Sequence, residues 1–198
     1  MKGNGNSRGS PRRIPEVLSL DDQARLLAQL DLSNSSGIRA RAILRLLLDT
    51  GLRASELINL QVRDLDFSSG RLWVRQGKGR KDRGLFFNGQ CGEVLQAWLA
   101  VRLSSGSAHL FTSLDGRKPI CGRWLRRFVK QLGEKIGAPW LHLHSLRHCF
   151  ASDLLAKTRN LVLVQQALGH TSIKTTVIYT HIQQPELEAA LKNLREGE

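Results

Sequence analysis

The stretch GLRASEL at residues 51–57 joins two segments whose apolar spacing predicts helices. Residues 38–49 carry Ile43, Leu44, Leu47 and Leu48 on one side of a helix, and Gly51 is the type of residue at which helices end. Arg53 then stands at the start of a second, short helix. In that position a guanidinium can face an anion beside the N–H groups of the helix start. The alternative is a surface arginine paired with Glu56, and this stretch alone does not decide between the two.

The rest of the chain shows the same helical spacing, interrupted by one region of alternating apolar residues. We expect helices at residues 20–30, 38–49, 54–59, 94–103, 122–136, 145–156, 161–168 and 185–194. Ser19 is the expected N-cap of the first helix. Strands are expected at residues 71–76 and 83–87, joined by a polar hairpin, and a short strand at residues 110–111. The sequence therefore predicts a mainly α chain with one small antiparallel β-sheet.

The chain is strongly basic, with 30 Lys and Arg residues against 17 Asp and Glu residues and a formal charge of +13. Such an excess favours a polyanionic partner. The basic residues are spread along the chain and not gathered on one amphipathic helix, which favours nucleic acid over a membrane surface. A basic protein that uses its charge only for solubility is the alternative.

Nothing in the sequence indicates export or disulfide bonding. No apolar run approaches the roughly 20 residues that cross a bilayer, and residues 1–11 lack the apolar character of a secretory signal. We therefore expect a soluble, intracellular protein. Cys91, Cys121 and Cys149 are odd in number and widely separated, so free, buried thiols are expected in place of a disulfide framework or a zinc ribbon.

The tip of the expected hairpin, residues 77–82, reads GKGRKD. Lys78 lies between two glycines and can enter a groove without steric hindrance, where it can contact a phosphate, a base edge or a leaving oxygen. A solvated turn is the alternative. Arg80, Lys81 and Arg83 compete with Lys78 for the same role.

The sequence HSLRH at residues 144–148 places His144, Arg147 and His148 on one face of the expected helix. A face rich in histidine can bind a metal, and His142 lies close by in the sequence. An arginine in the middle of a cation site is unfavourable, however. Anion binding is therefore favoured over metal binding.

Two further residues stand near the end of the chain. Gly169 can cap the helix that ends at residue 168 and leave His170 at its mouth. Tyr179, in the sequence TTVIYTH at residues 175–181, is the single tyrosine of the chain. A lone tyrosine on an apolar stretch is usually part of the core, so this motif is not decisive by itself.

Taken together and in order, these motifs resemble the tyrosine recombinase (phage integrase) family over roughly residues 13–191. The resemblance includes IPEVLS at residues 14–19 as well as the stretches quoted above. It implies the fold of the DNA breaking-rejoining catalytic domain, which is mainly α with a small antiparallel sheet. Six residues match the catalytic positions of the family: Arg53, Lys78, His144, Arg147, His170 and Tyr179.

The resemblance also implies a role for each matched residue. Tyr179 would attack a DNA phosphodiester, forming a 3′-phosphotyrosyl link and releasing a 5′-hydroxyl. Arg53 and Arg147 match the arginines on the scissile phosphate, where paired N–H donors stabilise the charge that builds on its oxygens. Lys78 matches the lysine that protonates the leaving oxygen.

The two matched histidines support the same pocket in the family. Since free tyrosine has a pKa of about 10, it needs a base or a positive pocket to attack at neutral pH. His144 can accept that proton, and His170 can donate to a phosphate oxygen. Glu56 is expected to orient Arg53 or to cap its helix and not to touch DNA.

The resemblance implies double-stranded DNA as the partner and no need for a cofactor, a metal or ATP. Residues 185–194 resemble the family's C-terminal helix, so docking on a neighbouring protomer in a DNA-bound tetramer is expected, in a cytoplasmic, nucleoid-associated protein. Residues 1–13 are expected to be a flexible basic tail or linker remnant and residues 14–198 the catalytic domain, without the separate N-terminal domain of the family.

Two local departures from the family pattern are mild: Thr158 stands where relatives often have a glycine that ends a helix, and Cys149 where a small hydroxyl residue is common. Competing hypotheses are relaxation of DNA like that of a type IB topoisomerase, a DNA-binding protein of the same fold with little or no recombinase activity, and a metal-dependent hydrolase built on the histidines. The sequence leaves open the DNA site and the choice among phage integration, movement of another mobile genetic element, and chromosome-dimer resolution.

Overall fold

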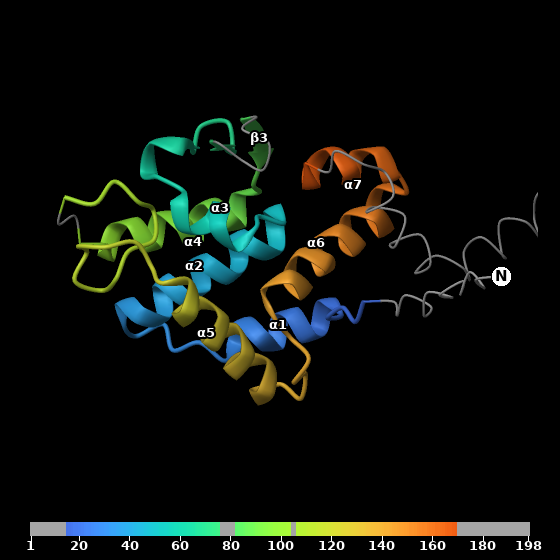
Figure 1. The fold of residues 1–198 in the computed structure, drawn as a ribbon, viewed down its shortest axis with the longest axis horizontal. Coiled ribbons are helices and arrows are strands. Elements are labelled where there is room, and N and C mark those ends of the chain that lie inside the picture. The colour runs from blue at the N-terminus through green and yellow to red at the C-terminus, as the bar shows by residue number, and fades with distance from the viewer. Residues whose placement is uncertain (1–14, 76–81, 104–105, 170–198) are drawn as a thin grey trace, which may run out of the picture.

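A computed structural model describes residues 15–75, 82–103 and 106–169 of the chain (Figure 1). In these ranges the structure is mainly helical with one small antiparallel sheet, which confirms the predicted fold class. The elements in chain order are α1 (Leu20–Ala28), α2 (Ser35–Thr50), α3 (Ala54–Asn59), the 3-10 helix η1 (Val62–Asp64), β1 (Leu65–Asp66), β2 (Arg71–Val74), β3 (Arg83–Phe86), α4 (Gly89–Val101), α5 (Gly122–Lys135), α6 (Leu143–Thr158) and α7 (Leu161–Leu168). The helix predicted at residues 185–194 lies outside the described residues.

Side-chain caps set where several helices begin. The Ser19 hydroxyl accepts the Asp22 N–H at 3.1 Å, as predicted for the start of α1. Asn34 accepts the Gly37 N–H at 2.9 Å, so α2 begins at residue 35 and not at 38. Asn88 caps α4 in the same way, and that helix begins before the predicted residue 94. Apolar spacing missed these first turns because their residues are mostly small or polar, whereas the caps fix the true start.

The sheet has the order β1-β2-β3, with antiparallel pairing throughout. The hairpin of β2 and β3 was predicted, and β1 was not, because a strand of two residues shows no alternation. Leu72 is the central residue, paired with Leu65 on one side and Leu85 on the other. The strand predicted at residues 110–111 is wrong: the residues on either side of it form only isolated bridges, and the two residues are apolar because both are fully buried.

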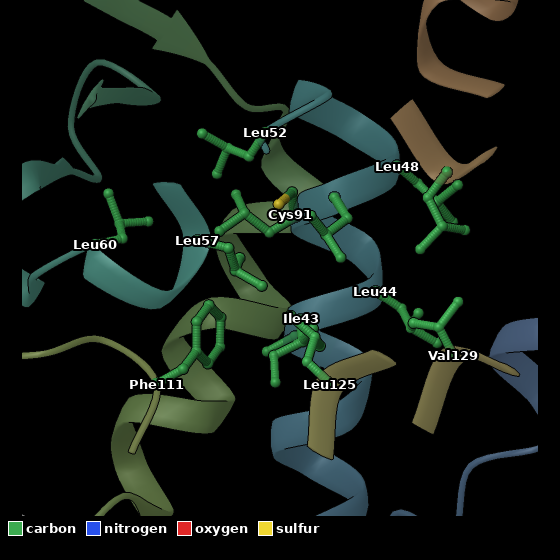
Figure 2. Packing of buried hydrophobic residues seen from close by; sticks show 14 of the residues in the cluster. Ile43, Leu44, Leu48, Leu52, Leu57, Leu60, Cys91, Phe111, Leu125 and Val129 are labelled. Atoms are coloured by element: carbon green, nitrogen blue, oxygen red, sulfur yellow. The ribbon is translucent and has the colours of Figure 1, made fainter. Parts of the chain in front are cut away.

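Helix α2 runs through the middle of the molecule and packs on α4 and α6. Its Ile43 and Leu44 lie in one apolar cluster with Leu125 and Val129 of α5 (Figure 2). Trp98 of α4 belongs to the same cluster, where its Nε1 donates to the Leu110 carbonyl at 2.8 Å. The buried indole N–H thereby has a hydrogen-bond acceptor, and this cluster packs α2, α4 and α5 together.

A second, smaller cluster joins the C-terminal half of α6 to α7. Its buried members are Ala151, Leu155, Val164 and Leu168. The connection from α6 to α7 is short, and Asn160 caps α7 by accepting two backbone N–H groups. This cluster, and not the main core, therefore holds α7 in place.

The three cysteines are free, but only two of them are buried. Cys149 accepts the Leu18 N–H at 3.2 Å and Cys91 lies in the main core, as expected. Cys121 is exposed at the start of α5, so the expectation of a buried thiol is wrong there: it is the N-cap residue, just ahead of the helix's buried stripe. Within the described ranges no helix is long and apolar enough to span a membrane.

Helix α6 ends on Arg159, which has a left-handed backbone with φ 51° although it is not a glycine. A side chain in this conformation is disfavoured by about 1 kcal/mol because its Cβ approaches the following carbonyl oxygen. We expect Arg159→Gly to have a higher free energy of unfolding than Arg159→Ala by about 1 kcal/mol. Urea unfolding of the two variants checks this, and since both lack the arginine side chain, only the backbone preference separates them. Equal midpoints would contradict it.

Candidate active site

A sharp turn between α2 and α3 positions Arg53. Gly51 ends α2 with a left-handed backbone at φ 61°, and Leu52 is buried beneath the turn. A Cβ at Gly51 would lie only 2.3 Å from Cδ1 of Phe150 on α6, so the backbone passes close to that ring. Arg53 is then the N-cap residue of α3, with its side chain half-buried.

Glu56 holds Arg53 in this position. Its Oε2 accepts the Arg53 backbone N–H at 2.8 Å, and its Oε1 accepts from Nη1 of the same arginine at 2.9 Å. The contact proposed from the sequence between these two residues is therefore present. Because the Glu56 side chain is only 5% exposed, the pair is a largely desolvated one.

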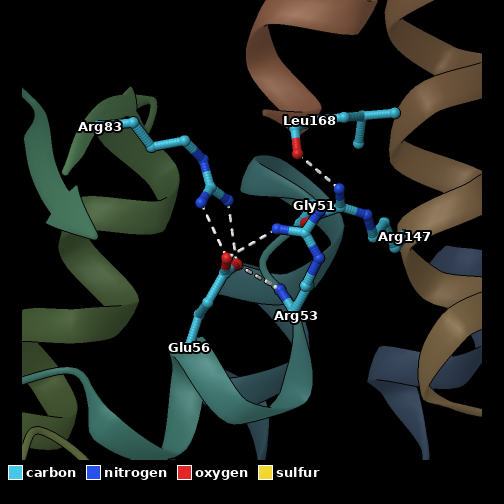
Figure 3. A network of polar contacts seen from close by, with 6 residues as sticks. All are labelled: Gly51, Arg53, Glu56, Arg83, Arg147 and Leu168. Carbon is cyan, nitrogen blue, oxygen red and sulfur yellow. Dashed lines mark hydrogen bonds and ion pairs between the residues drawn. The ribbon is translucent and has the colours of Figure 1, made fainter. Parts of the chain in front are cut away.

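Arg83 of β3 binds the same carboxylate from the opposite side (Figure 3). Its Nη1 lies 2.8 Å from Oε1 of Glu56 and its Nη2 lies 2.9 Å from Oε2, a bidentate arrangement. From the sequence alone, Arg83 is one of the residues that compete with Lys78 for contact with DNA at the hairpin tip. The signal that could have placed it is the two-residue period of β3, since Arg83 shares its face with the buried Leu85 and Phe87.

Arg147 is buried in the middle of α6 and is 2% exposed. Its Nη1 donates to the Gly51 carbonyl at 2.6 Å, and its Nη2 donates to the Leu168 carbonyl at 2.5 Å. These carbonyls end α2 and α7, where the partial negative charge of a helix end favours a cation. Arg147 therefore ties two helix ends together next to Arg53 (Figure 3).

His144 lies one turn before Arg147 and is exposed, with its ring against that of the buried His148 at 4.3 Å between centroids. Removal of water from the part of the ring that packs on the protein, followed by the positive charges of Arg147, His142 and Arg53, lowers the pKa of His144 below its ordinary value. The imidazole is therefore held in its neutral form at pH 7 and can accept a proton.

The structure thus brings together three of the six matched residues, Arg53, His144 and Arg147. Arg53 and Arg147 lie next to each other (Figure 3), and the positive charge of each lowers the pKa of His144. Lys78, His170 and Tyr179, like the competing Arg80 and Lys81, lie outside the described residues. Gly169, which precedes His170, ends α7 with φ 60° as predicted for a capping glycine.

A family model described as "Phage integrase family" matches residues 16–186. The chain belongs to this family. The resemblance inferred from the motifs is thereby confirmed. Tyrosine recombinase XerC of Escherichia coli O6:K15:H31 (strain 536 / UPEC) is 38% identical over 176 residues, which cover 87% of this chain and 58% of the relative. The chain therefore spans less than two thirds of the length of this relative.

Solved structures of phage integrase relatives share the fold. The crystal structure of XerA recombinase superposes with a TM-score of 0.78 at 35% identity, covering 93% of this chain and 67% of that one. XerH site-specific recombinase, bound to a palindromic difH substrate in a post-cleavage complex, gives 0.77 at 28% identity, covering 90% of this chain and 53% of that one. The catalytic domain of bacteriophage HP1 integrase, at 23% identity and a TM-score of 0.60, shares the fold, covering 89% of this chain and 93% of that one.

Proposed function

We propose that this chain cleaves and rejoins DNA as the catalytic part of a site-specific tyrosine recombinase, through a 3′-phosphotyrosyl intermediate on Tyr179. The observation that carries the proposal is the convergence of Arg53, Arg147 and His144 from the start of α3 and from α6. Two guanidinium groups beside a neutral imidazole are suited to a phosphodiester that gains charge in its transition state.

In this proposal the two arginines bind the non-bridging oxygens of the scissile phosphate and stabilise the charge that develops there. His144 accepts the proton of the attacking tyrosine, because its lowered pKa favours the neutral form that can accept a proton. Lys78 protonates the 5′ oxygen as it leaves, and His170 donates to a phosphate oxygen. No step requires a metal or ATP, because the phosphotyrosyl link conserves the bond that is later rejoined.

The proposed partner is double-stranded DNA. Helix α5 exposes Arg123, Arg126, Arg127 and Lys130 within two turns, in a chain whose formal charge is +13. Contacts between such cations and phosphates release counterions, so binding should weaken steeply as salt rises. XerH, one of the similar structures, was solved bound to a DNA substrate.

The proposal extends to the rest of the chain. Residues 14–198 form the catalytic domain and residues 1–13 a tail or linker remnant, and residues 185–194 dock on a neighbouring protomer in a DNA-bound tetramer. A truncation after Gln184 tests the last point, because it should prevent assembly on paired DNA sites. A truncated protein that still brings two sites together would refute it.

Covalent trapping tests the proposed reaction. The protein is incubated with nicked suicide DNA substrates, drawn from a pool of flanking genomic sequences, in the presence of a chelator, and denatured complexes are separated on a gel. We expect wild type to form a denaturation-resistant complex and Tyr179→Phe to form none while still binding DNA.

Each other outcome has a meaning. A complex in the Tyr179→Phe variant would show that a different residue is the nucleophile. DNA binding without any covalent complex would favour a non-catalytic binding protein, and a requirement for metal would favour a hydrolase. Strand exchange between two sites separates recombination from simple relaxation of DNA.

A further inference from the structure

Three charged side chains, those of Arg53, Glu56 and Arg83, meet at the start of α3. Their net charge determines how strongly the site attracts a phosphate. Arg53 and Glu56 taken alone form a neutral pair, in which the carboxylate contacts both the guanidinium and the backbone N–H of the arginine. A phosphate that approaches such a pair meets a cation whose charge is already cancelled. Arg83 adds a second positive charge, so that the three groups together carry one net positive charge.

The geometry gives Arg83 the stronger hold on the carboxylate. Arg83 contacts both oxygens through two terminal nitrogens, whereas the Arg53 side chain contacts one oxygen through one nitrogen. Burial by itself would raise the pKa of Glu56, but the hydrogen bonds from Arg83 and Arg53 outweigh burial and lower that pKa to about 2. Glu56 is therefore ionised at neutral pH and its charge has to be balanced.

The Arg83 side chain is fixed in place by its neighbours. A Cβ at Gly169 would lie 3.0 Å from Cδ and 3.1 Å from Nε of Arg83, so the arginine passes directly over this glycine at the end of α7. The Arg83 side chain is 16% exposed, which limits screening of its charge by water. β3 thus places the guanidinium of Arg83, which is constrained and poorly solvated, against the carboxylate of Glu56 on the side opposite Arg53.

We propose that Arg83 is a positioning residue that neutralises Glu56, so that Glu56 can cap α3 and orient Arg53 without cancelling the charge that Arg53 presents to a phosphate. This inference rests on the proposed function, because it concerns the same phosphate site. Arg83 acts through Glu56 and does not itself contact the phosphate.

The inference predicts that cleavage recovers among variants that are all fully folded, which a purely structural role of Arg83 would not produce. In Arg83→Met, Arg53 is the remaining arginine that balances the charge of the ionised Glu56. Cleavage in the trapping assay should therefore be slower by about 10- to 100-fold. This loss is smaller than the full effect of removing a hydrogen-bond donor to the phosphate. In the double variant Glu56→Gln/Arg83→Met the cancelling charge is gone, while the glutamine oxygen can still accept the Arg53 backbone N–H. Cleavage should then recover at least about tenfold over Arg83→Met.

A matched control removes another paired arginine. Arg45→Met takes away a guanidinium that lies 2.7 Å from Asp49 on α2 and is 26% exposed, and it lowers the net charge of the chain by the same amount. Its cleavage rate should equal that of wild type. Circular dichroism and urea unfolding of every variant establish that the folded protein is being compared, and Arg83→Lys, which keeps the charge, should fall between wild type and Arg83→Met.

A second readout does not depend on cleavage. Orthovanadate, a phosphate mimic, is titrated into each protein while the side-chain nitrogen signals of Arg53 are followed by NMR. We expect weaker binding in Arg83→Met and restored binding in the double variant. If wild type binds orthovanadate at Arg53 but never cleaves DNA, the proposed function fails and the rescue still decides the inference.

Two results would overturn the inference. One is an Arg83→Met variant that cleaves DNA and binds orthovanadate like wild type. The other is a double variant that is no better than Arg83→Met, since this would mean that Arg83 serves the fold and not the charge of the site.

Discussion

Replacement of Arg147 by alanine is expected to slow DNA cleavage by about 1000-fold and to lower the free energy of unfolding by about 2–4 kcal/mol. The arginine is 2% exposed and donates to the carbonyls of Gly51 and Leu168, so its loss leaves two helix-end carbonyls without these donors. Each buried carbonyl that loses its partner costs about 1–3 kcal/mol. The catalytic effect is larger because the same guanidinium is proposed to bind the phosphate.

Arg147→Lys separates the two contributions. A lysine keeps the charge but has one nitrogen, which cannot reach two carbonyls in the planar geometry of a guanidinium. We expect its unfolding free energy to lie between those of wild type and Arg147→Ala, with cleavage still strongly reduced. Urea unfolding and single-turnover trapping measure the two quantities. An Arg147→Ala protein that unfolds at the wild-type urea concentration would contradict the clamp between α2 and α7.

Replacement of Gly51 by alanine is expected to lower the free energy of unfolding by about 2–4 kcal/mol and to reduce cleavage as well. The glycine has a φ of 61°, and a Cβ there would lie 2.3 Å from the Phe150 ring, so either the ring or the turn has to move. A moved turn would displace Arg53 and the carbonyl that Arg147 binds. Stability and cleavage should therefore fall together.

Gly137→Ala is the matched control for this substitution. Gly137 also has a positive φ, of 79°, but nothing lies within 4 Å of the Cβ that alanine would add. Its loss of unfolding free energy should be about 1 kcal/mol, the cost of the backbone conformation alone, with cleavage unchanged. If both variants lose the same stability, the contact between the turn and Phe150 does not constrain the site.

The fold was largely predictable because its signals are local. The bounds of α3 and α7 were predicted as observed, since Arg53 and Glu56 set the start of α3, and Asn160 and Gly169 flank α7. The two errors in the strands arose where a pattern was too short to show alternation, or where a buried apolar pair could not be distinguished from a strand. The two residues of β1 show no period, and Leu110 and Phe111 are core residues that imitate a strand.

The identity of the site residues could be read from the order of the motifs, but the contacts between them could not. The bond from Arg147 to Gly51 spans 96 residues, and that from Arg83 to Glu56 spans 27. No local spacing encodes such pairs, and Arg83 looked like one of several cations near a hairpin tip. The two-residue period of β3 marks Arg83 as sharing a face with buried residues, but only the folded structure shows that it binds Glu56.

The separate cluster between α6 and α7 divides the buried apolar residues into two groups of unequal size. The main cluster contains residues from Leu18 to Cys149, whereas the α6–α7 cluster has four buried members. We expect the smaller group to open without global unfolding, so that the amide protons of α7 exchange with solvent while those of α2 remain protected. Each such opening would release the Leu168 carbonyl from Arg147. On this expectation, the local stability of the α6–α7 hairpin sets the fraction of time for which the contact between Arg147 and the Leu168 carbonyl is formed.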